Sequence, residues 1–234
     1  MSVNLQKDTA IKKLDLRKNT LEIILKDKKE QVATCARVAI VLDKSGSMRK
    51  LYKDGTIQNL LERIFPLALK FDDNGELDFW LFNDSFMLMP SVTLDNFFNY
   101  VETEIMTGLA SKFWGQTLYA PVMNDVFNAY VEKEPSKLPS YIIFITDGNN
   151  TDKNNTKEVL TKASHNNLFW QYVGIGNEKF DFLKRLDNLK NRFIDNANFF
   201  ETPDLNTVSD ADLYKLLLNE YPQWCEEARV NNLI

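Results

Sequence analysis

The sequence predicts an α/β protein built on a doubly wound, mostly parallel sheet with helices on both faces. From residue 35 onward, short aliphatic or aromatic runs alternate with longer amphipathic stretches, as repeated β-α-β units require. The short runs are almost continuously apolar, which is typical of strands that are covered on both faces. The chain has 234 residues, of which 44% are hydrophobic and 26% charged, so it is long and apolar enough to bury a sizeable core.

The first 34 residues differ from the rest of the chain in being polar with widely spaced apolar positions. These positions are Leu14, Leu21, Ile24 and Leu25. Their spacing is closer to the 3.6-residue period of a helix than to the alternation of a strand. We therefore expect an N-terminal helical arm over residues 1–34, followed by one domain over residues 35–234. The stretch TLEIIL could equally form a strand.

Four apolar runs are expected to form buried strands. They cover residues 37–42, 77–82, 141–146 and 168–175. Asn83-Asp84-Ser85 separates the second run from FMLM and indicates a hairpin turn, which makes FMLM an antiparallel edge strand. The amphipathic stretches between the runs predict helices at residues 55–71, 93–105, 117–133, 156–167, 180–189 and 210–221.

Charge and composition argue against several classes of function. The net charge of −5, without a block of Lys or Arg, offers no attraction to phosphate backbones, so nucleic acid is not an expected partner. We expect no membrane span, because no apolar stretch approaches the length of about 18 residues that one requires. The start lacks the features of a secretory signal, which predicts a mature protein that begins near Met1 in the cytoplasm. Cys35 and Cys225 indicate neither a disulfide framework nor a zinc site.

Oxygen-bearing side chains follow two of the predicted strands. RVAIVL ends in Asp43, Ser45 and Ser47, YIIFIT ends in Asp147, and the intervening loop GQTLYAP presents Thr117. Ligands of open α/β sheets bind where the carboxyl ends of the strands converge. Two carboxylates and three hydroxyls at that edge form a set of hard oxygen ligands suited to a divalent cation such as Mg²⁺.

The spacing within Asp-x-Ser-x-Ser supports a shared site. Alternate side chains of an extended segment point to the same side, so Asp43, Ser45 and Ser47 point together while Lys44 points away. Gly46 allows the backbone to turn. Hydroxyl ligands are neutral, so a cation held mainly by Ser and Thr keeps much of its charge. Such a cation can accept an external anionic oxygen from a partner's Asp or Glu, or from a phosphate.

With these motifs in this order, the sequence resembles a von Willebrand factor A (vWA) domain that carries a metal-ion-dependent adhesion site, abbreviated MIDAS. It is similar more narrowly to cytoplasmic bacterial vWA proteins associated with tellurium resistance. That similarity extends over roughly residues 35 to 230 and includes LYKDGTIQNLLERIFPLALKFDDNGELDFWLFND, FITDGNNTDK, FWQYVGIGNEKFDFLKRLDNL and DNANFF.

The resemblance implies a Rossmann-like fold with one metal site. In that site Ser45, Ser47 and Thr117 would bond the metal directly, while Asp43 and Asp147 would act largely through water. A partner's acidic side chain would complete the coordination shell. The metal would be Mg²⁺, with Mn²⁺ or Ca²⁺ as alternatives, and the function would be non-catalytic protein binding in a tellurium-resistance or stress-response assembly.

Simpler interpretations exist for each of these residues. Asp43, Ser47 and Thr117 could cap the helices that follow them, and Asp147 could belong to a plain turn. Beside Thr117, the loop carries Trp114 and Gln116, which we assign to partner contact, although Trp114 could equally be packed inward.

Two other functions are alternatives to the binding module. A Mg²⁺ ion with few charged ligands could serve a hydrolase of phosphate esters. However, His165 is the only histidine in the chain, so a histidine-based triad has no second candidate base. The third possibility is a structural scaffold in which the site is vestigial. We expect the protein not to be an enzyme.

Overall fold

The computed structural model describes residues 3–26, 35–72 and 74–234, and these contain a six-stranded sheet with the order β3-β2-β1-β4-β5-β6. The strands are β1 (Arg37–Asp43), β2 (Leu77–Phe82), β3 (Phe86–Val92), β4 (Ser140–Thr146), β5 (Leu168–Ile175) and β6 (Ala197–Thr202). All neighbouring pairs are parallel except β2 with β3, which is antiparallel at one edge. The predicted fold class is confirmed, including its antiparallel edge strand.

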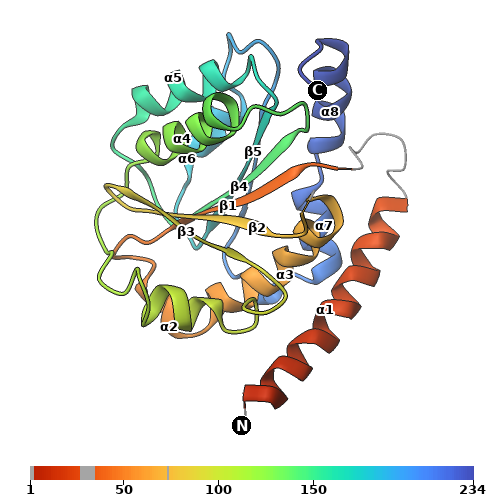
Figure 1. Cartoon of the computed structure of the whole chain (residues 1–234). Helices are drawn as coiled ribbons and strands as arrows, with labels where there is room; N and C mark the ends of the chain where they lie inside the picture. The colour runs from red at the N-terminus through yellow and green to blue at the C-terminus, as the bar shows by residue number, and fades with distance from the viewer. Residues whose placement is uncertain (1–2, 27–34, 73) are drawn as a thin grey trace.

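Helices cover both faces of the sheet (Figure 1). The α-helices are α1 (Val3–Lys26), α2 (Arg49–Lys53), α3 (Thr56–Phe71), α4 (Ala120–Phe127), α5 (Lys153–Ala163), α6 (Asp181–Asp187), α7 (Asp210–Leu217) and α8 (Tyr221–Val230). Two π-helices, η1 (Val101–Met106) and η2 (Asn128–Lys133), and the 3₁₀ turn η3 (Leu205–Thr207) complete the set. Helices α4, α5 and α6 lie on one side of the sheet, and α3, α7 and α8 lie on the other (Figure 1).

The central strand β1 shows why the strands are apolar throughout. Val38, Ile40 and Leu42 face the core on the α3 side, whereas Ala39 and Val41 face the core on the α4 side. Each of these five side chains is at most 1% exposed. Burial on both faces stabilises the strand by roughly 25 cal/mol for each Å² of apolar surface removed from water, which leaves no position for a polar side chain until the strand ends.

The structure adds α2 and α8 to the predicted helices and divides the one expected at residues 117–133 into α4 and η2. Two further differences from the sequence prediction have a clear physical reason. The helix expected at residues 93–105 is regular only from Val101, because the Asn96 side chain bonds the Thr93 N–H and the Ser91 carbonyl and holds the preceding residues in turns. Strand β6 was not predicted. It is an edge strand whose buried Asn198 donates to the Gln171 amide oxygen at 3.0 Å, so it lacks a continuous apolar pattern.

Helix α1 packs against α3 and α7 (Figure 1). Leu14 and Leu21 are buried at this contact. Arg17 is 7% exposed and donates to Asn59 and Glu62 of α3 and to Asp210 of α7. Most of the expected helical arm thus forms one helix, while residues 1–2 and 27–34 lie outside the described residues. The division between an arm and a domain at residue 35 stays a prediction.

Glu220, which precedes α8, lies near the acidic side chains of Asp187 and Asp195. Burial, followed by the charges of Asp187 and Asp195, raises the pKa of Glu220 to about 7, against the opposing charge of Arg192. An acid whose pKa is raised by folding stabilises the fold below its unfolded value of 4.5, and this contribution is lost as the pH rises through about 7. We expect the melting temperature to fall between pH 5 and pH 7.5, and to fall less in Glu220→Gln.

The matched control for this measurement is Glu226→Gln, which removes an exposed acid from the same helix and should leave the pH profile unchanged. Some slope should remain in Glu220→Gln, because burial also raises the pKa of Asp187 to about 6. Identical profiles for the wild-type protein and Glu220→Gln would contradict the assignment.

Candidate functional site

The site lies where β1 and β4 end side by side. The parallel register pairs Leu42 with Ile145, so the next residues, Asp43 and Thr146, are also neighbours. Asp43 is fully buried and accepts two hydrogen bonds, from the Ser45 N–H at 2.7 Å and from the Thr146 hydroxyl at 2.6 Å. These bonds fix the carboxylate at the carboxyl edge of the sheet and turn the chain after β1 toward Ser47.

Three oxygen atoms cluster beside Asp43. The Ser45 and Ser47 hydroxyl oxygens are 3.1 Å apart, and the Ser47 hydroxyl donates to Asp147 Oδ1 at 2.8 Å. Around an octahedral Mg²⁺ with bonds of about 2.1 Å, neighbouring ligand oxygens are about 3 Å apart. The spacing of this cluster therefore fits two adjacent edges of such an octahedron, and the donor set consists of the hard oxygens that Mg²⁺ prefers.

Thr117 reaches the same edge through its loop. Gly115 forms an isolated bridge with Ser45 and accepts from the Gly46 N–H at 3.2 Å. Thr117 follows two residues later and is half-buried. Within the described residues, its hydroxyl makes no hydrogen bond to the two serines or the two aspartates. The structure thus brings four of the five predicted ligands into one hydrogen-bonded cluster and places the loop of the fifth next to them.

The electrostatics of the cluster favour an added positive charge. Burial raises the pKa of Asp43 to about 6, although hydrogen bonds from Thr146 and Ser45 oppose this rise, and burial also raises the pKa of Asp147. No Lys or Arg among the described residues forms an ion pair with either carboxylate. The described residues also contain no group of three His, Cys, Asp or Glu side chains that could hold a metal, so a cation here would depend on the hydroxyls.

Lys44 points away from the oxygen cluster, as the alternation of the segment predicts. It is fully buried and donates to the carbonyls of Ile105 and Ala110. Burial, together with the positive charge of Arg49, lowers the pKa of its ammonium to about 8. Lys44 therefore does not compete with a cation for the space between Ser47 and Asp147.

The two residues assigned to partner contact differ in exposure. Gln116 is exposed. Trp114 is half-buried, with the Lys44 ammonium 4.7 Å and the Arg49 guanidinium 4.1 Å from its ring centroid, and it packs edge-on against Tyr52 at 5.5 Å. Trp114 is thus part of the packing around the site, and only a portion of its ring is left for contact with another molecule.

Sequence reasoning missed the residues that support the ligands. The Tyr119 hydroxyl donates to the Gly148 carbonyl at 2.6 Å, and Asp152 accepts from the backbone N–H groups of Tyr119 and Ala120 at the start of α4. These contacts tie the loop after β4 to the segment that follows Thr117. Among the supporting residues, only Thr146 could have been found from the sequence, because it ends its strand beside Asp43.

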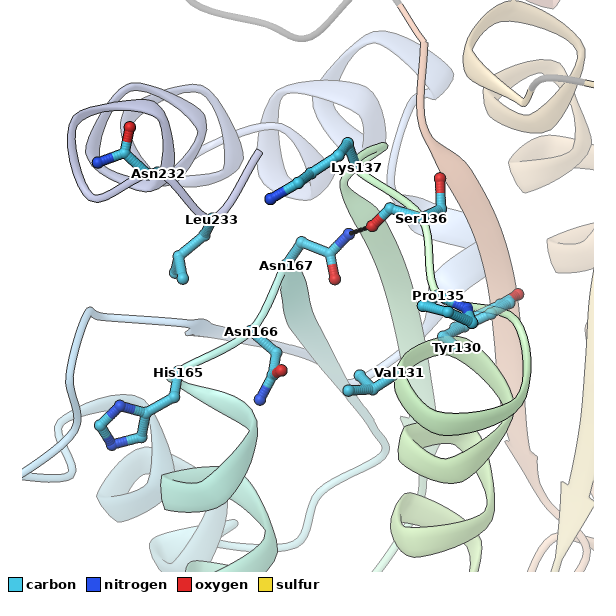
Figure 2. Close-up of a pocket in the computed structure, with 10 residues that line it drawn as sticks. All are labelled: Tyr130, Val131, Pro135, Ser136, Lys137, His165, Asn166, Asn167, Asn232 and Leu233. Carbon is cyan, nitrogen blue, oxygen red and sulfur yellow. Dashed lines mark hydrogen bonds between the residues drawn. The ribbon is translucent and has the colours of Figure 1, made fainter.

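The histidine lines a separate cavity (Figure 2). This cavity, of about 480 Å³, is lined by Tyr130, Val131, Pro135, Ser136, Lys137, His165, Asn166, Asn167, Asn232 and Leu233. Ser136 and Asn167 precede β4 and β5, so the cavity lies at the amino ends of these strands, whereas Asp43 and Asp147 lie at carboxyl ends. His165 is therefore not available to act on a molecule bound at the oxygen cluster.

Comparison with known protein families gives a direct assignment. Residues 35–234 match the vWA-TerF-like family, described as the vWA found in the TerF C terminus. The chain belongs to this family. Within the described residues, no helix of this vWA-TerF-like protein is both long and apolar enough to cross a membrane.

One relative of this chain is a bacterial protein of similar length. The "Uncharacterized protein YcbR" of Bacillus subtilis is 43% identical over 221 residues, which cover 94% of this chain and 90% of that protein. Among solved structures, manganese-loaded TRAP protein of Plasmodium vivax matches with a TM-score of 0.58 and 17% identity, covering 81% of this chain and 74% of that chain.

A second solved structure is proximal thread matrix protein 1 of the mussel byssus, with a zinc-occupied MIDAS motif. It matches with a TM-score of 0.55 and 15% identity, covering 82% of this chain and 46% of that chain. At these identities the two structures establish the shared fold.

Proposed function

We propose that this protein is a non-catalytic, metal-dependent module that binds another protein. The observation that carries the proposal is the spacing of the Ser45, Ser47 and Asp147 oxygens, at 3.1 and 2.8 Å, beside a buried carboxylate. The proposed ligands are Asp43, Ser45, Ser47, Thr117 and Asp147. We infer Mg²⁺ as the ion, with Mn²⁺ or Ca²⁺ as alternatives, because all the donors are hard oxygens.

The proposed partner presents an Asp or Glu side chain. Two carboxylates and three neutral hydroxyls leave the charge of a divalent cation available to an oxygen from outside, so an acidic side chain can complete the shell. Exposed Gln116 and the accessible part of Trp114 would contact the surrounding surface of that partner. Membership of the family, and the similarity of this chain to the manganese-loaded and zinc-occupied proteins, support this proposal. We extend it to a cytoplasmic tellurium-resistance or stress-response assembly.

Magnesium should stabilise the folded protein. A ligand that binds only the native state at a concentration of 100 Kd adds about 2.7 kcal/mol to the free energy of unfolding. For a chain of this size that gain corresponds to a rise of roughly 5–10 °C in melting temperature. Differential scanning calorimetry with increasing MgCl₂, and with EDTA as the metal-free reference, measures this rise. A melting temperature that does not change at millimolar Mg²⁺ would support the scaffold alternative.

The protein-binding part requires a separate test. An affinity pull-down from the source cells, run in parallel with Mg²⁺ and with EDTA, should retain the partner only in Mg²⁺. Retention that is equal in both would contradict the metal bridge. A panel of phosphate esters with Mg²⁺ and Mn²⁺ tests the hydrolase alternative, and turnover that disappears in Asp147→Ala would overturn the non-catalytic assignment.

A further inference from the structure

Lys44 lies inside the Asp-x-Ser-x-Ser motif but faces away from its oxygens. Its side chain is fully buried, and its ammonium donates to the Ile105 carbonyl at 2.9 Å and to the Ala110 carbonyl. Among the described residues, no carboxylate forms an ion pair with it. An ammonium removed from water requires other oxygen partners, so these two carbonyls account for the burial of Lys44.

The positions of the two carbonyls explain why a cation fits there. Ile105 belongs to the last turn of η1, where the carbonyls lack partners in the helix and form the negative end of its dipole. Ala110 lies four residues after the end of η1, in the loop that leads to Trp114. The Trp114 ring adds a third favourable contact, with the ammonium 4.7 Å from its centroid. Lys44 thus holds the end of η1, the loop and the indole together.

We propose that Lys44 is a positioning residue that fixes the segment 105–117 against the loop after β1. The segment begins at one Lys44 contact, contains the second, and continues through Trp114 and Gly115 to Thr117. Among the described residues, the segment's backbone makes one further tie to the Asp43–Met48 loop, the bridge between Ser45 and Gly115. The effect of this anchoring on Thr117 as a metal ligand rests on the proposed function. The anchoring of the segment itself does not.

Hydrogen exchange of the metal-free protein tests the anchoring. Lys44→Met keeps the length and apolar packing of the side chain but removes both hydrogen bonds and the charge. We expect backbone amides within 105–117 to exchange at least about tenfold faster than in the wild-type protein, since hydrogen bonds to charged groups contribute most to local stability. Peptides from β4 and β5, measured by mass spectrometry in the same sample, should exchange as in the wild-type protein.

Arg49→Met is the matched control. Arg49 also lies over the Trp114 ring, at 4.1 Å, but it is exposed and, among the described residues, donates to neither carbonyl, so its removal should raise exchange in 105–117 much less than Lys44→Met does. If Lys44→Met does not fold, Lys44→Gln replaces it, because its neutral amide can still donate to one carbonyl and should give a smaller increase. Unchanged exchange in 105–117 in the folded variant would overturn the proposal.

The affinity for Mn²⁺, followed by the electron paramagnetic resonance signal of the free ion, separates this proposal from the proposed function. Faster exchange with at least about fivefold weaker Mn²⁺ binding in Lys44→Met would support both the anchoring and its effect on Thr117. Faster exchange in a protein whose wild-type form binds no Mn²⁺ would support the anchoring and reject the metal site. Faster exchange with unchanged Mn²⁺ affinity would overturn the link between Lys44 and Thr117.

Discussion

Replacing Asp43 with asparagine should reduce the affinity for Mg²⁺ or Mn²⁺ by at least about a hundredfold and abolish Mg²⁺-dependent retention of the partner. A unit charge about 4 Å from another contributes roughly 4 kcal/mol at the effective dielectric constant of a protein, and about 1.4 kcal/mol corresponds to a tenfold change in affinity. Isothermal titration calorimetry of the wild-type protein and Asp43→Asn measures the effect directly.

The asparagine variant should still fold. The amide oxygen can accept from the Ser45 N–H, and the amide nitrogen can donate to the Thr146 oxygen, because that hydroxyl can rotate toward Tyr119 Oη, 3.3 Å away. Asp54→Asn is the control, since it makes the same chemical change at an exposed position on the C-terminal side of α2. Metal affinity equal to that of the wild-type protein in Asp43→Asn would place the cation elsewhere.

Most of the fold could be predicted because its central strands are buried on both faces. Strands β1 and β4 have uninterrupted apolar runs with polar residues at their ends, and β2 and β5 each carry one internal polar residue, Asp78 and Gln171, in an otherwise apolar run, which marks both their type and their limits. Strand β6 escaped detection because it lies at an edge and carries a buried Asn198 whose hydrogen bond to Gln171 is visible only in three dimensions. Local pattern identifies a strand when most of its residues are apolar, and fails in a short strand such as β6, half of whose residues are polar.

The ligand candidates could be predicted from the sequence, whereas the residues that surround them could not. Asp43 and Asp147 end parallel strands that the register makes neighbours, so their meeting follows from the sheet alone. The role of Lys44 does not follow from the sheet, because its two carbonyl partners are 61 and 66 residues away in the sequence. Backbone acceptors have no sequence signature, so the burial of this lysine could be found only from the structure.

Arg63 should be the charged residue on which the stability of the fold depends most. It is 3% exposed in α3 and donates to Asp210 Oδ1 at 2.5 Å and to the carbonyls of Leu205 and Val208 at 2.7 and 2.6 Å. Its removal takes the guanidinium away from all three acceptors, although Asp210 keeps its ion pair with Arg17. Because a buried acceptor left without its donor costs about 1–3 kcal/mol, and the Leu205 and Val208 carbonyls both lose the guanidinium, we expect Arg63→Met to lose about 2–4 kcal/mol of unfolding free energy in urea denaturation.

The matched control is Lys215→Met on α7. Lys215 pairs with Asp212 at 3.7 Å, and both side chains are about two-thirds exposed (65% and 64%), so its loss should change stability by less than about 1 kcal/mol. Arg63→Lys should be intermediate, because an ammonium keeps the charge but cannot reach all three acceptors in the geometry of the guanidinium. Since Arg63 lies away from the oxygen cluster, the folded fraction of Arg63→Met should bind Mg²⁺ with wild-type affinity. A loss of unfolding free energy below about 1 kcal/mol would show that η3 and α7 pack against α3 without Arg63.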